Sequence, residues 1–242
     1  MEIFKSWLVE RYIAHRGLHN DKYPENSIGA FINAIEHDYP IELDVHLLAD
    51  GTVAVFHDAK LSRMTHKDGY IENLTKAELS DYHLDNTEYT IPTFEEVLKL
   101  VDGKVPLLIE IKNTGKVGDL ESATYKLLKD YKGEYAVQSF NPFSMQWFYN
   151  NAPEVWRGQL AGYFKGEKLS WIRKFALKRM FLNKKVSHPN FISYDHRNIP
   201  NRFVKKYKNL PLIVWTVRKQ EDYMKVVKYC DNIIFENFEP KI

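Results

Sequence analysis

The stretch IELDV, residues 41–45, is the part of the chain that decides the expected fold, because its apolar residues alternate with Glu42 and Asp44. Alternation with a period of two is typical of a β-strand, and it places both carboxylates on one face of that strand. A second stretch, LLIEI at residues 107–111, is a nearly continuous apolar run that carries a single carboxylate, Glu110. Buried parallel strands have this composition.

Short apolar or β-branched runs of this kind recur along the chain, and segments with helical spacing lie between most of them. The runs are YIAH ending at His15, IELDV from Ile41, LLIEI from Leu107, YAVQSF from Tyr135, GQLAGY from Gly158, NFISYD from Asn190, LIVWTV from Leu212 and NIIFE from Asn232. Strands that alternate with helices indicate a parallel α/β fold, and eight of them close naturally into a barrel. We therefore expect an α/β protein of the (β/α)8 TIM-barrel class.

Helical segments follow several of these strands. SIGAFINAIEH opens at a predicted N-cap, Ser27, and LESATYKLLKDY and QEDYMKVVKYC carry apolar residues at steps of three and four. The alternation breaks once, where a predicted hairpin through Asp50 and Gly51 leads to TVAVFHD and then to a polar stretch at about residues 59–90. We expect this stretch to be a small insertion after the second strand, within a single domain over residues 1–242.

The composition narrows the class of protein. The chain has 242 residues, of which 44% are hydrophobic and 27% charged, and this suits one barrel domain. Its net charge of +2 does not indicate a nucleic-acid partner. No run approaches the roughly 18 apolar residues of a membrane span, and the first residues lack the apolar core of a signal peptide. A single cysteine, Cys230, allows no intrachain disulfide, so the cytoplasm is the expected compartment.

Three acidic residues form a predicted metal site. Glu42 and Asp44 share one strand face, and Glu110 lies on the next predicted strand of the barrel. Carboxylates that converge inside a barrel repel each other unless a cation neutralises them, and an all-oxygen ligand set favours Mg²⁺ or Ca²⁺ over zinc. The residues leave the choice between these two ions open.

Two histidines are the candidates for proton transfer. His15 ends the first predicted strand in HRG, and His57 ends the hairpin in HD, so both are expected at the same barrel mouth. Arg16 offers a planar fork for phosphate oxygens, and Lys112 offers a compact positive charge beside the metal. A metal with two histidines and two cations suits acid and base catalysis on a phosphodiester.

A series of short motifs resembles the glycerophosphodiester phosphodiesterase family. The motifs are HRG at His15, PEN at Pro24, ELD at Glu42, DG at Asp50, HD at His57, IPTFEEVL at Ile91 and EIK at Glu110, with weaker likeness in SF at Ser139 and WTV at Trp215. The resemblance implies a barrel enzyme that uses a divalent ion to hydrolyse glycerophosphodiesters to glycerol 3-phosphate and an alcohol.

The resemblance also implies a role for each residue at the site. It makes His15 and His57 the acid/base pair, without saying which is the acid. The metal ligands would be Glu42, Asp44 and Glu110, and the phosphate contacts Arg16 and Lys112. Glu25 and Asn26 of PEN would position groups near the site, and Trp215 is a candidate contact to the glycerol moiety, with a wall or core position as its alternative.

The chain departs from the family pattern near its end. Arg218 follows WTV where the family usually has asparagine, and the last predicted strand reads IIFEN instead of closing in ITD. Glu236 would then replace the aspartate, and Phe235 and Phe238 would make that end of the mouth bulkier. These differences bear on the specificity for the leaving alcohol. The predicted metal ligands and histidines are unchanged.

Residues 165–185 form an unusual segment, with eight Lys or Arg against one acidic residue, interleaved with Trp171, Phe175 and Phe181. A crossover helix with a solvated basic face is one interpretation. A peripheral helix that docks on anionic membrane is the other, and it would favour lysophospholipids, as a lysophospholipase D, over soluble glycerophosphodiesters. A catalytically silent lipid-binding barrel is a third alternative, which would be expected to lack a histidine or a ligand.

Overall fold

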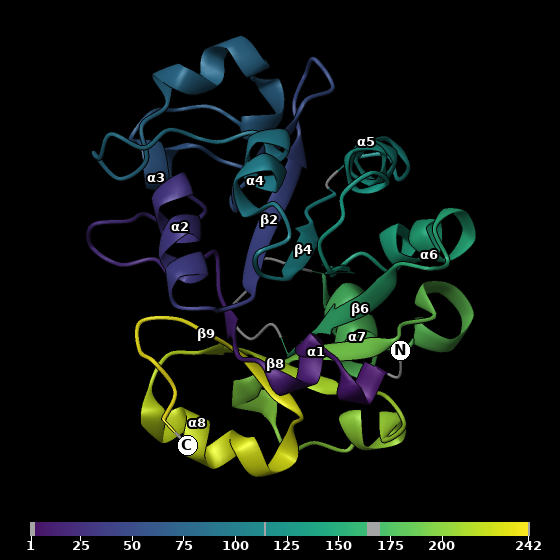
Figure 1. Ribbon diagram of the computed structural model, residues 1–242. Coiled ribbons are helices and arrows are strands. Elements are labelled where there is room, and N and C mark those ends of the chain that lie inside the picture. Colours follow the sequence, from purple (N-terminus) through teal and green to yellow (C-terminus); the bar gives the residue numbers. More distant parts are fainter. Residues whose placement is uncertain (1–2, 114, 164–169, 242) are drawn as a thin grey trace. The chain divides into compact units, whose positions relative to one another are not determined.

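The computed structural model describes residues 3–113, 115–163 and 170–241, and it divides into two compact units. One unit comprises residues 14–135, and the other comprises residues 1–13 together with residues 136–242. Each unit carries parallel strands connected by helices (Figure 1). We describe the two units separately.

In the unit of residues 14–135 the central strand is β2 (Ile41–Leu47). It pairs in parallel with β1 (Ile13–Ala14) on one side and with β4 (Leu107–Ile111) on the other. From Val45 onward it also pairs with the antiparallel strand β3 (Val53–Val55). β4 pairs with β2 only over residues 41–45, so the later part of β2 belongs to the hairpin. The turn of this predicted hairpin holds Gly51 at φ +83°, a conformation that favours glycine.

The described residues of this unit form four α-helices: α2 (Ile28–Glu36), α3 (Ser62–Thr65), α4 (Phe94–Val101) and α5 (Asp119–Leu128). Oγ of Ser27 accepts a hydrogen bond from the N–H of Ala30, which confirms the predicted N-cap of α2. Thr93 and Glu96 cap α4 reciprocally, and this pairing explains the sequence TFEE inside the motif IPTFEEVL. Helices α2 and α4 pack against each other.

The insertion after β2 differs from its prediction as a polar stretch. It contains α3 and the 3₁₀ helices η2 (Ile71–Asn73) and η3 (Lys76–Asp81). Its apolar side chains form a core of their own with the hairpin: Leu48, Ala54, Phe56, Leu61, Met64, Ile71, Leu74, Leu79, Leu84 and Ile91. The polar residues between them cover the outside of this small core.

In the part of the other unit that the structure describes, five parallel strands lie in sequence order: β5 (Tyr135–Ser139), β6 (Trp156–Ala161), β7 (Phe191–Asp195), β8 (Leu212–Val217) and β9 (Asn232–Phe235). Their helices are α1 (Trp7–Glu10), α6 (Pro142–Asn151), α7 (Trp171–Arg179) and α8 (Gln220–Val226). All eight predicted strands therefore exist within a few residues of their expected positions. Helix α6 was not predicted from the sequence.

The basic segment was predicted over residues 165–185, and residues 164–169 lie outside the described part of the chain. The rest forms α7 and a helical turn at Asn183–Ser187. Among the described residues, no helix is both long enough and apolar enough to cross a membrane.

Candidate active site

Three buried carboxylates lie together on two neighbouring strands. Glu42 and Asp44 share one face of β2, and Glu110 on β4 is the register partner of Asp44. One oxygen from each lies within 4.8 Å of the others, and the residues are only 2%, 1% and 7% exposed. The structure thus brings the three predicted metal ligands into one cluster.

Two cationic side chains border this cluster. Nζ of Lys112 lies 3.0 Å from Oε1 of Glu110 and 3.3 Å from Oδ1 of Asp44. Nε of Arg16 lies 3.5 Å from Oδ2 of Asp44, and its backbone N–H donates to Oε2 of Glu42. Both residues that the sequence assigned to phosphate therefore stand beside the predicted metal ligands.

Burial and neighbouring charges shift the pKa values of the three carboxyls in different directions. Burial, reinforced by the charge of Asp44, raises the pKa of Glu42 well above its usual range. Burial also raises the pKa of Glu110, although Lys112 opposes it. At Asp44 burial is outweighed by the charges of Lys112 and His57, so the pKa of Asp44 lies well below its usual range. The protein's own cations thus keep one of the three carboxyls ionised.

The loop with the PEN motif contacts the same cluster. Nδ2 of Asn26 donates to Oδ2 of Asp44 at 2.9 Å, and Nη1 of Arg16 donates to Oε1 of Glu25 at 2.7 Å. Both Arg16 and Asn26 have positive φ, at 53° and 55°, so the loop needs a conformation that most residues adopt rarely. Asn26 thus contacts Asp44 directly, whereas Glu25 is connected to the cluster through Arg16, and the positioning role of both residues stays a prediction.

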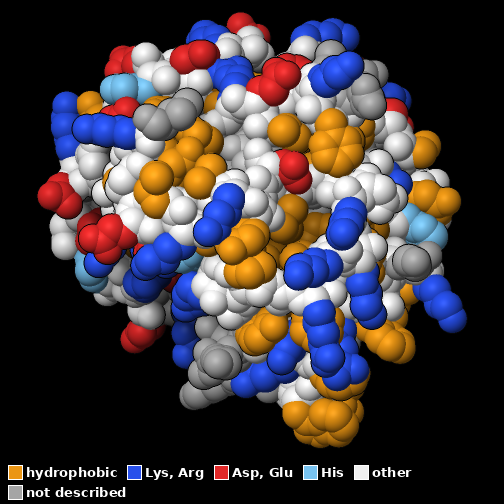
Figure 2. Space-filling view, turned by 90° about the horizontal axis from the view of Figure 1, so that it is seen from below, with side chains coloured by type: hydrophobic (Ala, Val, Ile, Leu, Met, Phe, Trp, Pro, Cys, Tyr) orange, Lys and Arg blue, Asp and Glu red, His pale blue; other side chains and the backbone are white. Residues whose placement is uncertain are grey.

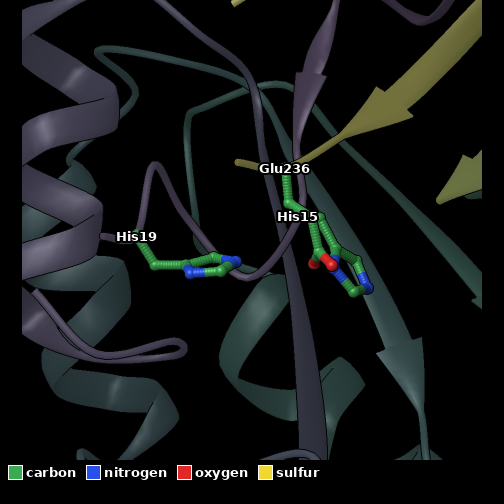
Figure 3. A group of neighbouring side chains, drawn as sticks. All are labelled: His15, His19 and Glu236. Atoms are coloured by element: carbon green, nitrogen blue, oxygen red, sulfur yellow. The ribbon is translucent and has the colours of Figure 1, made fainter. Parts of the chain in front are cut away.

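His15 follows β1 directly, and its Nε2 lies 4.0 Å from Oε2 of Glu42. Figure 3 shows His15 and His19 on the same loop, and ring nitrogens of the two lie within 4.8 Å of each other. His19 was not singled out from the sequence. The third residue drawn there, Glu236, belongs to the other unit, where it pairs with Arg218.

His57 lies two residues beyond the end of β3 and is partly exposed. Its Nδ1 lies 2.6 Å from Oδ1 of Asp58, and its backbone carbonyl oxygen lies 3.2 Å from Nε2 of His46. Burial lowers the pKa of His46. Electrostatic interaction with His57 favours the ionised forms of Asp44 and Glu110, and so acts to lower the pKa of each of these two carboxyls.

Trp215 lies in the other unit, on β8. Its indole packs edge-on against Phe140, with ring centroids 5.5 Å apart, and its Nε1 has no hydrogen-bond partner among the described residues. The contact with the glycerol moiety that the sequence predicted for Trp215 stays a prediction.

Two further residues belong to the surroundings of the site and were missed. Asp58 is part of the HD motif, so the dipeptide itself signalled it. Arg63, on α3, reaches both Asp58 and Glu25. No local pattern points to Arg63, because its partners lie 5 and 38 residues away.

The carboxylate cluster fits a hard divalent cation. All its donors are oxygens, the kind of ligand that Mg²⁺ and Ca²⁺ take. Oδ1 of Asp44 is enclosed and accepts no hydrogen bond of good geometry from any described residue, although Lys112 lies 3.3 Å away. A buried acceptor without a hydrogen bond is costly, and a cation would relieve that cost. The residues present could therefore hold a divalent ion.

A comparison with solved structures supports the fold. A phosphodiesterase from Oleispira antarctica, solved in complex with the product sn-glycerol-3-phosphate, superposes with a TM-score of 0.79 over 94% of this chain and 93% of that chain, at 23% identity. At that identity the likeness concerns the fold alone, and it confirms the (β/α)8 barrel class expected from the sequence.

Curated relatives match along most of the chain. A glycerophosphodiester phosphodiesterase from Caldanaerobacter subterraneus is 33% identical over 95% of each chain. A lysophospholipase D from Rattus norvegicus is 31% identical over 144 residues, which are 54% of this chain and 45% of the rat protein. The family model described as "Glycerophosphoryl diester phosphodiesterase family" matches residues 15–237. The chain therefore belongs to the glycerophosphoryl diester phosphodiesterase family, an enzyme family that hydrolyses glycerophosphodiesters.

Proposed function

We propose that this chain hydrolyses glycerophosphodiesters to sn-glycerol 3-phosphate and an alcohol, with a divalent cation, Mg²⁺ or Ca²⁺, held by Glu42, Asp44 and Glu110. The observation that carries the proposal is the cluster of three buried carboxylates within 4.8 Å of one another, bordered by Arg16 and Lys112. When bound, the cation would neutralise the carboxylates and polarise the phosphoryl group for attack by water.

The two cationic side chains are suited to the phosphate. The guanidinium of Arg16 already binds Glu25, so its plane is oriented before a substrate arrives, and orientation in advance lowers the cost of binding. The side chain of Lys112 is largely buried, and the carboxylates of Glu110 and Asp44 overcome the effect of burial and raise its pKa. Lys112 therefore stays positively charged at neutral pH and balances part of the charge of a phosphodiester.

The two histidines would divide the proton transfers. One histidine accepts a proton from the attacking water, and the other donates a proton to the oxygen of the leaving alcohol, so the products are a phosphomonoester and a neutral alcohol. For His57 the free ring atom is Nε2, because Nδ1 is bonded to Asp58. Glu25 and Asn26 act as positioning residues, since they bind Arg16 and Asp44.

A lysophospholipid is the second candidate substrate, and the feature that favours it is α7 together with Phe181, which lies just beyond the end of this helix. Trp171, Ile172 and Phe181 are 75%, 61% and 72% exposed, although large apolar side chains are usually buried. In Figure 2, hydrophobic side chains at the lower edge of the molecule lie among Lys and Arg side chains, and acidic side chains are sparse there. Exposed aromatic residues flanked by cations are typical of helices that bind anionic membrane.

The remaining alternatives and the expected compartment rest on the sequence. A silent barrel should have lost a histidine or a ligand, and this chain keeps all of them. Cys230 is half-buried, and burial raises the pKa of its thiol to about 12, so this cysteine is poorly reactive. A reducing cytoplasm remains the compartment that we expect for the chain.

The test is an assay of the purified chain against glycerophosphocholine, glycerophosphoethanolamine and lysophosphatidylcholine, with Mg²⁺, with Ca²⁺ and with excess chelator. We expect release of sn-glycerol 3-phosphate from at least one glycerophosphodiester and its loss in chelator. Full turnover in chelator would contradict the metal assignment, and absence of hydrolysis with every substrate and metal would contradict the proposed function.

A further inference from the structure

A single guanidinium connects the insertion to two loops of the site. Nη1 and Nη2 of Arg63 donate to Oε2 and Oε1 of Glu25 at 2.9 and 2.6 Å, so the pair is bidentate. Nε of the same group donates to Oδ2 of Asp58. Arg63 therefore holds one carboxylate of the PEN loop and one carboxylate of the HD motif together.

The contact between Asp58 and His57 determines which ring nitrogen of His57 carries the proton. Burial opposes ionisation of Asp58, but the hydrogen bonds from His57 and Arg63 outweigh it and hold the pKa of Asp58 well below its usual range. An ionised carboxylate can only accept, so Nδ1 of His57 must donate across the 2.6 Å contact. The neutral imidazole then carries its proton on Nδ1, and the lone pair that can accept a proton lies on Nε2.

The backbone around His57 is held as well. A carbonyl oxygen only accepts, so the 3.2 Å contact makes Nε2 of His46 the donor to the carbonyl of His57. The N–H of Phe56 donates to the carbonyl of Asp44 at 3.0 Å, which ties the same segment to β2. With both its backbone and its Nδ1 bonded, the ring of His57 has little freedom to turn.

The contacts of Arg63 extend through Glu25 to Arg16, the predicted phosphate contact. Glu25 accepts from Arg63 and also from Nη1 of Arg16, at 2.7 Å. Burial opposes ionisation of Glu25, but the bonds and charges of Arg63 and Arg16 outweigh it and lower the pKa of Glu25. The chain of contacts thus runs from His57 through Asp58, Arg63 and Glu25 to Arg16.

We propose that Asp58 and Arg63 are positioning residues for the hydrolysis. Asp58 holds His57 with its proton on Nδ1 and Nε2 free for proton transfer, and Arg63 fixes the carboxylates of Asp58 and Glu25 relative to each other. The insertion then has a role in the reaction, because α3 supplies Arg63. This inference rests on the proposed function of His57 and Arg16.

Replacing Arg63 should change the rate of hydrolysis more than the free energy of folding. Its side chain is 47% exposed, and exposed ion pairs contribute little to the free energy of folding because water and salt screen them. Partners that orient a group at an active site are worth more to the reaction, typically about 10- to 100-fold.

Three variants and one control separate the role of Asp58 from that of Arg63. Asp58→Asn should lower kcat about 10- to 100-fold with little change in KM, because it acts on His57 while the bidentate pair of Arg63 with Glu25 remains. Arg63→Met should lower kcat and raise KM together, because it releases both Asp58 and Glu25. Arg63→Lys should be intermediate, since an ammonium cannot bond bidentately to one carboxylate while binding the other. Lys99→Met is the matched control, because it breaks an exposed ion pair with Glu95 on α4 and should leave both constants unchanged.

A spectroscopic measurement reports the tautomer directly. In ¹⁵N-labelled protein above the pKa of the ring, the His57 signals, assigned with His57→Gln, should show the Nδ1–H tautomer in the wild type. Asp58→Asn should lose it, since the amide can donate to Nδ1. Arg63→Met should keep it, because Asp58 remains. Thermal unfolding checks that each variant is folded, and the exposed Arg63 variants provide the kinetic test if Asp58→Asn does not fold.

Three results would overturn the inference: an Nε2–H tautomer for His57 in the wild type, a folded Asp58→Asn with kcat within about twofold of the wild type, or an Arg63→Met with unchanged kcat and KM. A wild type that hydrolyses no glycerophosphodiester would instead contradict the proposed function. The tautomer would remain measurable in that case, so the two failures can be told apart.

Discussion

Asp44 on β2 is the direct register partner of Glu110 on β4, so two buried carboxylates stand side by side across neighbouring parallel strands. Like charges this close raise each other's pKa unless cations intervene. Lys112 contacts both carboxylates, yet Oδ1 of Asp44 still accepts no hydrogen bond from the described residues. The pair therefore has the charge and the free lone pair that a divalent ion requires.

Glu110→Gln should abolish most of the activity and weaken Mg²⁺ or Ca²⁺ binding by about tenfold or more, because it removes one charge and one anionic ligand from a three-carboxylate site. Metal titration by calorimetry and the rate at saturating metal measure the two effects. Glu95→Gln is the control, because Glu95 is an exposed residue on α4. Unchanged metal affinity in Glu110→Gln would remove Glu110 from the set of ligands.

His15→Ala and His57→Ala should each lower kcat about 10²- to 10⁴-fold and leave metal affinity nearly unchanged, because neither histidine is a proposed ligand. The double variant should lose less than the product of the two effects, since residues that act as a unit are not additive. The bell-shaped pH profile of the wild type should lose one limb in each single variant, and the missing limb would identify the acid and the base. Near-normal turnover of His57→Ala would assign the proton transfer to another group.

Asp58 should make stability depend on pH. Burial opposes its ionisation, but hydrogen bonds from His57 and Arg63 lower the pKa of Asp58 in the folded protein below the value of about 3.9 expected in the unfolded chain. Ionised Asp58 thus stabilises the fold above about pH 4, and the contribution is lost as the pH falls through the folded-state pKa. Asp58→Asn should have a lower Tm than the wild type near about pH 7, and the difference should shrink below about pH 4. A difference in Tm that is constant across this range would exclude the ion pair as its cause.

The strands and the carboxylate cluster could be predicted because period-two alternation sets which face a side chain takes. This is why Glu42, Asp44 and Glu110 could be grouped before any geometry was known. The role of Arg63 could not be predicted, since its partner Glu25 lies 38 residues away and only the folded insertion brings the two together. The core of the insertion was also missed, because its apolar residues are spaced among polar ones without helical or strand periodicity. Helix α6 lacks a clear apolar stripe, although Asn141 and Pro142 signal its start.

The last prediction concerns α7 and decides between the two candidate substrates. If the helix docks on anionic membrane, its exposed Trp171 and Ile172 insert at the interface, and each nearby cation adds up to about 1 kcal/mol. The wild type should co-sediment with vesicles of phosphatidylcholine and phosphatidylserine and detach in about 1 M salt, where the Debye length is about 3 Å. Changing Lys174, Lys178 and Arg179 to Gln should abolish binding and lower activity on lysophospholipid in vesicles, while activity on glycerophosphocholine stays unchanged.

Two further variants test whether charge and apolar contact both act. Trp171→Ser with Phe181→Ser should weaken vesicle binding even at low salt, because both side chains are more than two-thirds exposed and their removal leaves the core of the unit intact. Lys99→Gln with Lys104→Gln, two exposed lysines of the other unit, should leave binding unchanged. If the wild type does not bind anionic vesicles at low salt, α7 is an ordinary solvated crossover helix. We would then favour a soluble glycerophosphodiester over a lysophospholipid as the substrate.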